Sequence, residues 1–342
     1  MRGEMAASKI HVHAQTAPGA LLAPMVLDAP SPPEGHDVDV EVDHCSVCHS
    51  DVHLLDGDWG DVARPLVPGH EIVGRVVAKG ERAPSSLAIG AVVGIGWQAG
   101  ACGSCPACTT GREHLCTGGK VRTCVGRQGG FASQVRCDAR FCFEIPRGLD
   151  VRDAAPLLCA GLTVFSPLER LGAGAAAGKR VGVVGVGGLG HLAVAFARAM
   201  GAEVLAFDPD LTKRDLVLEL GARELVDARG ALPKNAVDLL LVTTHATLDW
   251  NAWLGVLDLE GTLCLVGVPG APLVLSADPL MDEQKKVTGS VIGSPGAMKR
   301  MLALAAHNHI VPIVERMPMA RVNDAIARVR SGSARMRIVL DA

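Results

Sequence analysis

Residues 180–200, RVGVVGVGGLGHLAVAFARAM, contain the stretch that decides the fold of the central part of this chain. The run Gly185-Val186-Gly187-Gly188-Leu189-Gly190 matches the pattern Gly-x-Gly-x-x-Gly. The apolar residues 180–184 before it predict a buried strand, and residues 189–200 have the apolar spacing of a helix. A strand, a glycine-rich turn and a helix in this order form a nucleotide-binding unit. The competing interpretation is a structural turn that is merely rich in glycine.

The residues of this loop have separate physical roles. Gly185 and Gly187 permit a tight turn and a close approach of the backbone to a pyrophosphate, while Gly190 lets the helix pack against the strand. Gly188 and Leu189 complete the loop, whose N–H groups at the helix N-terminus would bind the phosphates. The sequence therefore predicts a dinucleotide site here.

Asp208 stands at the end of the next expected strand, residues 203–207. Its carboxylate can accept two hydrogen bonds from the adenine ribose diol of NAD(H), and it would repel the 2′-phosphate of NADP(H). NAD(H) is therefore favoured. Lys213 and Arg214 follow closely and could accept a phosphate, so NADP(H) remains an open alternative.

The rest of the chain shows two different patterns. From about residue 163, strand and helix patterns alternate, which predicts a parallel sheet covered by helices. Further strands are expected at residues 236–242 and 262–266, and a helix at residues 213–220. The first third has short alternating runs, such as residues 38–42 and 72–77, which predict an antiparallel, barrel-like domain. The tail predicts two helices and a last strand, at residues 298–307, 322–330 and 337–340.

The bulk composition narrows the functional classes. A chain of 342 residues exceeds one ordinary core, so two domains are expected. The formal charge of −3, the scattered Lys and Arg and the lack of Tyr argue against a nucleic-acid partner. The longest uncharged run, residues 181–197, is shorter than the roughly 20 residues that a membrane span needs. No secretory signal pattern opens the chain, so we expect a soluble cytoplasmic protein with reduced thiols.

A cluster of thiols has the spacing Cys-x2-Cys-x2-Cys-x7-Cys and consists of Cys102, Cys105, Cys108 and Cys116. Four thiolates satisfy one tetrahedral zinc ion, and such a closed site holds a loop together without an open position for substrate. An iron–sulfur motif also uses Cys-x2-Cys-x2-Cys, but it closes after three residues with Cys-Pro, whereas Thr117 follows here. A disulfide pair is the other alternative. We expect a structural zinc site.

A second set of metal-binding side chains is spread along the chain. Cys48 lies in the segment CSVCHSDVH, residues 45–53, and His70 and Glu71 stand between two short strands. Cys159 follows an apolar run. Spacing alone does not show that these residues meet, and Cys45 with Cys48 also fits a redox Cys-x-x-Cys pair.

Together these motifs resemble the zinc-dependent medium-chain alcohol dehydrogenases, most closely the cinnamyl alcohol dehydrogenase branch, over nearly the whole chain. The resemblance rests on the motifs already quoted and on residues 57–60, 68–71, 155–161 and 337–340. It implies an α/β protein of two domains. A GroES-like antiparallel β-barrel catalytic domain would span residues 1–160 and be completed by 295–342. An inserted Rossmann domain, a doubly wound parallel sheet, would span residues 161–294.

The resemblance also implies roles for single residues. Cys48, His70 and Cys159 would bind a catalytic zinc ion, with Glu71 as a further or alternate ligand. This Cys2His set is already known as the catalytic-zinc set of alcohol dehydrogenases. Asp51 would hold His70 through its second ring nitrogen.

The remaining implied roles concern the proton and the cofactor. The hydroxyl of Ser50 and the imidazole of His53 would carry a proton between the substrate and water. Besides the glycine loop, Asp208 and Lys213, the expected contacts to the cofactor come from His49, Thr163 and Arg337.

We therefore expect an oxidoreductase that interconverts primary alcohols and aldehydes, broad toward aromatic and aliphatic substrates, by hydride transfer with NAD(P)(H). It would hold one catalytic and one structural zinc ion and form a homodimer through its nucleotide-binding domains. Trp59 and Trp97 are candidate walls of the substrate pocket, or plain core. Two alternatives on the same fold remain, a zinc-independent quinone or enone reductase and a non-catalytic cofactor-binding regulator.

Overall fold

The computed structural model describes residues 9–174 and 178–342, and the parts of the predicted domains that fall on residues 1–8 and 175–177 lie outside them. The chain divides into two compact units. The barrel unit comprises the chain up to Cys159 together with Ser294–Leu302 and Val311–Ala342, and the sheet unit comprises Ala160–Gly293 and Ala303–Ile310. The chain thus leaves the barrel unit twice, after Cys159 and after Leu302, and returns to it each time.

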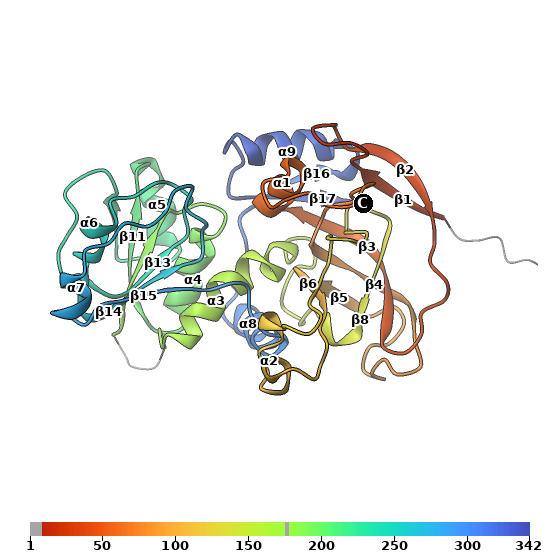
Figure 1. Ribbon diagram of the computed structural model, residues 1–342, viewed down its shortest axis with the longest axis horizontal. Helices are drawn as coiled ribbons and strands as arrows, with labels where there is room; N and C mark the ends of the chain where they lie inside the picture. The colour runs from red at the N-terminus through yellow and green to blue at the C-terminus, as the bar shows by residue number, and fades with distance from the viewer. Residues whose placement is uncertain (1–8, 175–177) are drawn as a thin grey trace, which may run out of the picture. The chain divides into compact units, whose positions relative to one another are not determined.

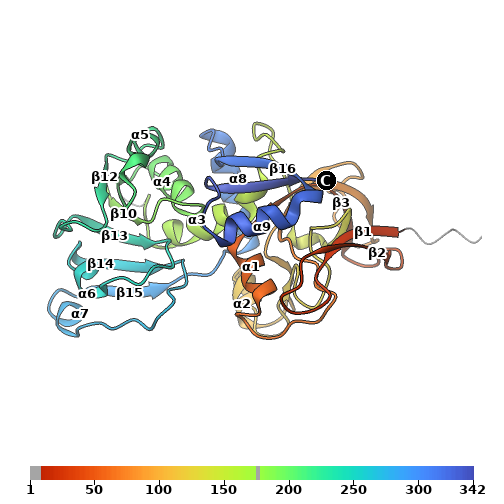
Figure 2. The ribbon, with the colours of Figure 1, turned by 90° about the horizontal axis from the view of Figure 1, so that it is seen from above.

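The sheet unit is built on a parallel sheet with the strand order β12-β11-β10-β13-β14-β15 (Figure 1, Figure 2). Its strands are β10 (Arg180–Val184), β11 (Glu203–Asp208), β12 (Glu224–Asp227), β13 (Val237–Val242), β14 (Leu257–Leu265) and β15 (Lys286–Gly289). All neighbours run parallel, and the order reverses between β10 and β13. Ligands of doubly wound sheets bind at such a reversal, beyond the carboxyl ends of the strands.

Helices pack against this sheet through large apolar side chains. Those of the sheet unit are α3 (Ala160–Arg170), α4 (Gly190–Ala199), α5 (Arg214–Glu219), α6 (Trp250–Leu254) and α7 (Asp278–Met281). Phe165 of α3 meets Phe196 of α4 edge to face, with ring centroids 5.8 Å apart. Phe207 of β11 meets Trp253 of α6 in the same way at 5.2 Å. Helix α8 (Pro295–His307) begins in the barrel unit and ends in the sheet unit.

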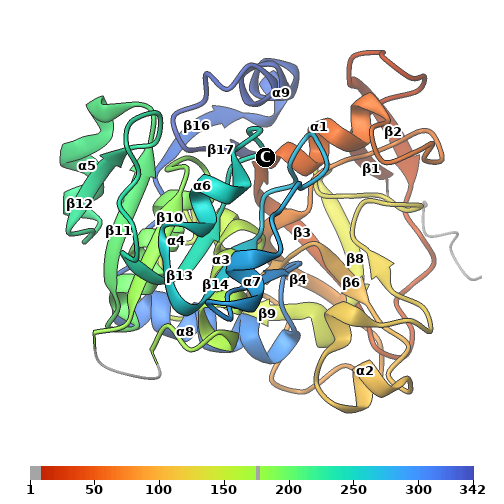
Figure 3. The same cartoon turned by 60° about the vertical axis from the view of Figure 1, so that its left-hand side comes forward.

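The barrel unit is organised around one long strand, β3 (Asp37–Val47). The other strands of its main sheet are β4 (Glu71–Lys79), β5 (Val92–Ile95), β8 (Gln134–Asp138), β9 (Cys142–Glu144), β16 (Val314–Pro318) and β17 (Arg337–Asp341). β3 pairs antiparallel with β4, β8 and β17, and Figure 3 shows β3, β4 and β8 side by side. Two register shifts in β3 bend the sheet around its core.

Smaller elements complete the barrel unit. They are the paired strands β1 (Lys9–Ala14) and β2 (Ala23–Asp28), the paired strands β6 (Gln98–Gly100) and β7 (Val121–Arg122), and the helices α1 (His49–Asp56), α2 (Pro106–Thr109) and α9 (Val322–Arg330). Short 3₁₀ helices lie at Glu113–Leu115, Ala139–Phe141, Ala155–Leu158, Leu211–Lys213 and Met319–Arg321, the fourth of them in the sheet unit. The core residues without exposed surface come from several of these strands and include Val38, Val40, Ile72, Val93, Ile95 and Ile338.

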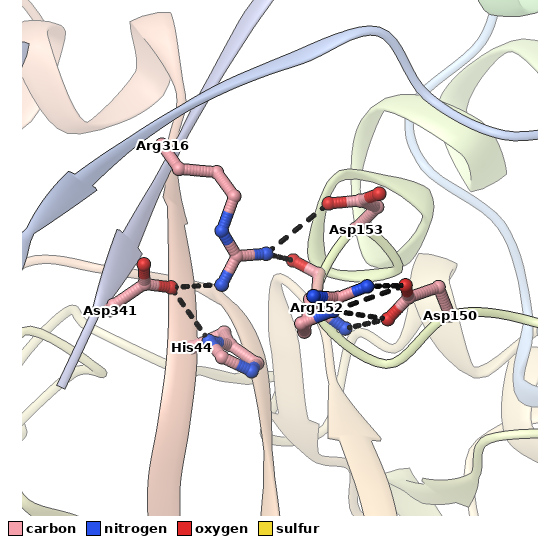
Figure 4. Close-up of polar contacts among 6 residues, drawn as sticks. All are labelled: His44, Asp150, Arg152, Asp153, Arg316 and Asp341. Atoms are coloured by element: carbon pink, nitrogen blue, oxygen red, sulfur yellow. Dashed lines mark hydrogen bonds and ion pairs between the residues drawn. The ribbon is translucent and has the colours of Figure 1, made fainter.

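Polar contacts fasten the returning tail to the first part of the barrel unit (Figure 4). Arg316 of β16 donates to the carbonyl oxygen of Arg152 at 2.9 Å and to Asp341 of β17 at 2.5 Å. Asp341 also bonds Nδ1 of His44 in β3 at 2.9 Å. Arg316 reaches Asp153 at 3.3 Å. These contacts join strands that are far apart in the sequence, so the tail is an integral part of this unit.

The structure confirms the predicted fold class and corrects several element boundaries. The strand at residues 180–184 and the helix at residues 322–330 lie where they were predicted. The helix expected at residues 213–220 is a 3₁₀ turn followed by α5, and β14 begins five residues before the expected 262. Neither β12 nor β15 was predicted. Within residues 9–174 and 178–342 no helix is long and apolar enough to cross a membrane.

Candidate active site and metal centres

Potential metal ligands from three segments meet inside the barrel unit. One ligand atom from each of Cys48, His70, Glu71 and Cys159 lies within 4.8 Å of the others. Cys48 precedes α1, Glu71 begins β4, and Cys159 follows the 3₁₀ helix Ala155–Leu158. His70 and Glu71 are fully buried. The structure therefore brings together the residues that spacing alone could not connect, and their role as zinc ligands stays a prediction.

Asp51 of α1 fixes two of these segments at once. Its Oδ1 accepts hydrogen bonds from Nδ1 of His70 at 3.0 Å and from the Gly69 N–H at 2.9 Å. Its Oδ2 accepts the Cys48 N–H at 2.9 Å. A carboxylate can only accept, so Nδ1 of His70 carries a proton and Nε2 is the ring nitrogen left to bind a metal ion. Gly69 has φ +96° and leaves no room for a Cβ, which would lie 2.7 Å from the Phe131 nitrogen.

The ligand set fits a zinc ion by a direct observation. Within the described residues, the buried atoms His70 Nε2 and Glu71 Oε2 have no hydrogen-bond partner. A buried polar atom left unsatisfied is costly, and a metal ion would satisfy both. The second Glu71 oxygen accepts from the guanidinium of Arg337, at the start of β17. Two sulfurs, an imidazole and a carboxylate are the donor types that zinc prefers.

The charges of the group favour a bound cation. A hydrogen bond from the Cys159 thiol lowers the pKa of Cys48 well below its ordinary value, against the effect of burial. The same contact, together with burial, raises the pKa of Cys159. Burial acts to lower the pKa of His70, but the negative charges of Asp51 and Cys159 raise it well above its ordinary value. Cys48 is thus the member of the group that most readily becomes a thiolate, and a bound divalent cation would compensate its charge.

A row of rings leads from this group toward the surface. Trp97 lies edge-on to His70 with ring centroids 4.8 Å apart, and Trp59 lies edge-on to Trp97 at 5.9 Å. Trp59, which is 46% exposed, also stacks on His53 at 5.0 Å. Nδ1 of His53 bonds Oδ2 of Asp58 at 2.6 Å. The two tryptophans predicted as pocket walls therefore lie next to the ligand group and the proposed proton carrier.

The other predicted residues of this segment occupy the first turn of α1. Ser50 is its second residue and lies three positions before His53. The ring of His49 contacts that of His53, with centroids 4.9 Å apart. One helical turn therefore carries the expected hydroxyl, the expected imidazole and an expected cofactor contact.

The four-cysteine segment folds into a compact lobe around its sulfur atoms. The distances between sulfurs are 3.9 Å for Cys102–Cys108, 3.9 Å for Cys105–Cys116 and 3.5 Å for Cys102–Cys116. A tetrahedral site with zinc–sulfur bonds of about 2.3 Å requires sulfurs about 3.8 Å apart. Backbone N–H groups lower the pKa of Cys105 to about 5 and that of Cys102 to about 7, which favours thiolates. The lobe fits a structural zinc ion, with Cys102, Cys105, Cys108 and Cys116 as ligands.

The predicted glycine loop connects β10 to α4 in the sheet unit. Gly185 has φ +86°, which favours glycine. A Cβ on Gly190 would lie 1.8 Å from the Gly185 carbonyl oxygen, so no other residue fits there. A Cβ on Gly187 would meet no atom within 4 Å, so the loop is open at that point. Gly188 and Leu189 complete the turn into α4, and Thr163 lies nearly buried in α3.

Asp208 ends β11 and is nearly buried at 3% exposure. Its oxygens accept hydrogen bonds from the Val186 N–H at 2.6 Å and the Asp210 N–H at 2.9 Å. Nζ of Lys213 lies 3.1 Å from both oxygens and 3.0 Å from the Val186 carbonyl oxygen. Asp208 and Lys213 therefore hold the N–H and the C=O sides of Val186 and brace the glycine loop. The sequence indicated a ribose acceptor but not this brace.

A cavity of about 790 Å³ opens beside the glycine loop within the sheet unit. Its lining includes Gly185, Phe207 and Pro209, which lie on the β10–β11 side, and Thr244, which follows β13. The lining is mainly apolar in character, as expected for the face of an adenine ring. The cavity thus lies at the reversal in strand order, where doubly wound sheets bind nucleotides.

Sequence reasoning missed several residues that the structure places at these sites. Asp58, within the quoted residues 57–60, is the partner of His53, and only its proximity in sequence could have indicated this. Cys124 was not predicted as a site residue, yet it groups with Asp51 and His70, with ligand atoms within 4.8 Å of one another. Thr243 donates to the carbonyl oxygens of Val184 and Gly185 at 3.0 and 2.6 Å. No local pattern points to either contact.

Comparison with known protein families gives two matches. Residues 34–147 match the alcohol dehydrogenase GroES-like domain, and residues 188–307 match the zinc-binding dehydrogenase domain. The chain is 41% identical over 309 residues to the aldehyde reductase AdhA of Synechocystis sp., covering 89% of this chain and 91% of that protein.

Solved structures give the same picture. A cinnamyl alcohol dehydrogenase from Sorghum bicolor superposes with a TM-score of 0.91 at 32% identity, covering 98% of each chain. The cinnamyl alcohol dehydrogenase of Helicobacter pylori, solved with NADP(H), superposes with a TM-score of 0.89 at 28% identity, again over 98% of each chain.

Proposed function

The chain belongs to the zinc-type medium-chain alcohol dehydrogenase family, and on this basis we propose that it interconverts primary alcohols and aldehydes by hydride transfer with NAD(P)(H). The observation that carries the proposal is the convergence of Cys48, His70, Glu71 and Cys159 on one buried point, where His70 Nε2 and Glu71 Oε2 have no hydrogen-bond partner in the part of the chain that the structure describes. A closed four-cysteine lobe elsewhere in the same unit supports a separate, structural metal.

The proposed machinery assigns a task to each group. When bound, a catalytic zinc ion would polarise the substrate oxygen and the nicotinamide would give or take the hydride. Cys48, His70 and Cys159 would hold the metal, and Glu71, itself held by Arg337, would be available as a further ligand. Asp51 orients the His70 ring.

The cofactor would be held mainly by the sheet unit. The N–H groups of the glycine loop face a pyrophosphate, and the neighbouring apolar cavity takes the adenosine. From the barrel unit, His49 and Arg337 would contribute to the pyrophosphate by the family resemblance. Thr163 would lie beside the nicotinamide.

The cofactor preference is proposed as NAD(H). Asp208 places a nearly buried carboxylate where the adenine ribose binds, and a 2′-phosphate would meet that charge. Lys213 is already engaged by Asp208 and Val186 and is therefore not available as a separate phosphate ligand. The Helicobacter pylori relative was solved with NADP(H), so the proposed preference would distinguish this chain from that relative.

The proton released by alcohol oxidation would pass from Ser50 to His53 and then to Asp58 or water. We expect His53→Gln to lower kcat for alcohol oxidation at pH 7 by about 100-fold, the size typical of a lost acid–base group. The loss should shrink at high pH, where hydroxide takes the proton directly, and added imidazole should restore part of the rate.

The pH–rate profiles of wild type and variant check this prediction. His36→Gln, which replaces an exposed histidine of the barrel unit, is the matched control and should leave the profile unchanged. An equal loss at every pH, with no rescue by imidazole, would contradict a proton-carrying role for His53.

The two alternatives on the same fold make different demands on these residues. A zinc-independent quinone or enone reductase has no use for ligand atoms converging at a buried point. A non-catalytic regulator has no use for the His53–Asp58 pair, whose distance of 2.6 Å suits proton exchange. Oxidation of NADH and NADPH by purified protein, tested across aromatic and aliphatic aldehydes, separates the three. Turnover with aldehydes supports the proposal, and turnover with enones alone favours the reductase.

We also propose a homodimer that forms through the sheet unit. β15 pairs only with β14 within the described chain and so offers an edge strand. In the same unit, Val274 and Met281 expose 74% and 73% of their surface.

We expect Val274→Lys with Met281→Lys to weaken self-association at least about tenfold, because charge replaces buried apolar contacts. Light scattering over a range of concentrations measures this, with Leu21→Lys as a control on the equally exposed Leu21 of the barrel unit. A wild-type monomer at high concentration would contradict the proposal.

A further inference from the structure

The second residue of α4, His191, lies directly behind the glycine loop and has no assigned role. Its ring is fully buried. The carbonyl oxygen of Gly187 accepts two hydrogen bonds from it, one from the backbone N–H at 3.1 Å and one from Nδ1 at 2.9 Å. A carbonyl oxygen can only accept, so Nδ1 carries the proton. The imidazole therefore acts on the loop as a hydrogen-bond donor in a fixed place.

The bond that His191 holds belongs to the peptide between Gly187 and Gly188. Two adjacent glycines form the most easily rotated peptide in a chain, because neither side chain opposes the turn. In a trans peptide the C=O and the N–H point in opposite directions. While His191 holds the Gly187 oxygen, the Gly188 N–H must therefore point away from α4. A flipped peptide would instead present a carbonyl oxygen to the phosphates of a dinucleotide.

The rest of the loop is already fixed by other groups. Asp208 and Lys213 hold Val186, and Thr243 holds the Gly185 carbonyl oxygen. The loop is open at Gly187, where a Cβ would meet no atom within 4 Å. The Gly187–Gly188 peptide is held by His191, whose backbone N–H and Nδ1 both bond the Gly187 oxygen, and the side chain contributes the second of these two bonds.

We propose that His191 is a positioning residue that locks the Gly187–Gly188 peptide with its N–H directed to the cofactor pyrophosphate. This inference rests on the proposed dinucleotide site. Without the bond from the side chain, part of the binding free energy of the cofactor would be used to orient this peptide. The side chain removes that cost. It also explains why a buried polar ring stands at the N-terminus of α4, where an apolar residue would pack at lower cost.

The test compares two probes that differ only in phosphate. ADP carries a pyrophosphate, whereas adenosine carries none, so only ADP senses the peptide. We expect His191→Leu to weaken ADP binding by about five- to tenfold, the effect of one lost neutral hydrogen bond, and to change adenosine binding within about twofold. His191→Asn places an amide nitrogen near the position of Nδ1 and should recover most of the ADP affinity. Isothermal titration of the full chain measures all of these affinities.

The outcomes separate the possible explanations. If adenosine and ADP weaken in parallel, His191 only stabilises the unit and the proposal is wrong. Unchanged ADP binding by His191→Leu, or an Asn variant as weak as the Leu variant, would overturn it as well. A wild-type chain that binds ADP but turns over no aldehyde would contradict the proposed function while leaving this inference standing. A wild-type chain that binds neither ADP nor adenosine would show that the proposed dinucleotide site is wrong, and this inference would fail with it.

Discussion

Replacement of Cys48 by alanine is expected to lower kcat/KM for aldehyde reduction by about ten-thousandfold, since the loss of metal polarisation removes several kcal/mol of transition-state stabilisation. Cys48 holds one corner of the ligand group, and its low pKa makes it the thiolate that remains charged there. Metal analysis of the variant should show loss of the catalytic zinc with the structural zinc retained. The fold should persist, because the bond from the Cys48 backbone N–H to Asp51 at the start of α1 does not require the sulfur.

Cys45→Ala is the matched control for this prediction. Cys45 is also a cysteine and lies three residues before Cys48, in β3. Its sulfur is close to Gly69 and Gly130 and lies outside the ligand group. It should keep its zinc and most of its activity. If Cys48→Ala retains more than a few per cent of wild-type turnover, the metal does not act through this group, and the zinc-independent reductase becomes the better account.

Asp208→Ser is expected to shift the ratio of kcat/KM for NADPH over NADH by about 100-fold toward NADPH. The serine removes the negative charge that opposes a 2′-phosphate and releases Lys213 to bind it. NADH should lose part of its affinity in the same step. A serine hydroxyl cannot replace a carboxylate that accepts from Val186, Asp210 and Lys213 together.

The double variant Asp208→Ser with Lys213→Met isolates the contribution of the lysine. It should lose the gain for NADPH while NADH binding stays weak. Steady-state kinetics with each cofactor at fixed aldehyde provide the measurement. A wild-type enzyme that prefers NADPH would show that the carboxylate does not set the cofactor preference, and the brace of the glycine loop would then be its main task.

The parts of the fold that were predictable are those that local sterics dictate. β10 and α4 lie within about one residue of their predicted ends. The loop between them requires glycine at Gly190, where a Cβ would meet the Gly185 carbonyl oxygen, so the glycines mark both ends in the sequence. β12 and β15 were not predicted, because they are strands of four residues at the sheet edges, and β12 has one buried position while β15 has none. Their place is set by pairing with β11 and β14, which a local pattern does not contain.

The same distinction between local patterns and long-range pairing applies to the candidate site. The cysteine lobe was predictable from spacing, since its ligands lie within one short segment. Cys48, His70 and Cys159 come together only through the long-range pairing of the barrel strands, so the residues alone left their meeting open. The ion pair between Glu71 and Arg337 joins positions 266 residues apart, and nothing in either local segment indicates it. Contacts over such a distance in sequence can be identified only from the folded structure, in which β17 of the tail pairs with β3.

The proposed dependence of aldehyde reduction on zinc is tested by measuring aldehyde-dependent NADH oxidation as a function of the zinc bound per chain. Zinc is first removed with a chelator, then returned stepwise, and bound metal and turnover are measured on the same samples. We expect turnover to be absent without zinc and to rise in proportion to occupancy of the Cys48, His70 and Cys159 site, and we expect Cys48→Ala never to recover. Full turnover by zinc-free protein, or none from protein in which both sites are filled, would contradict it.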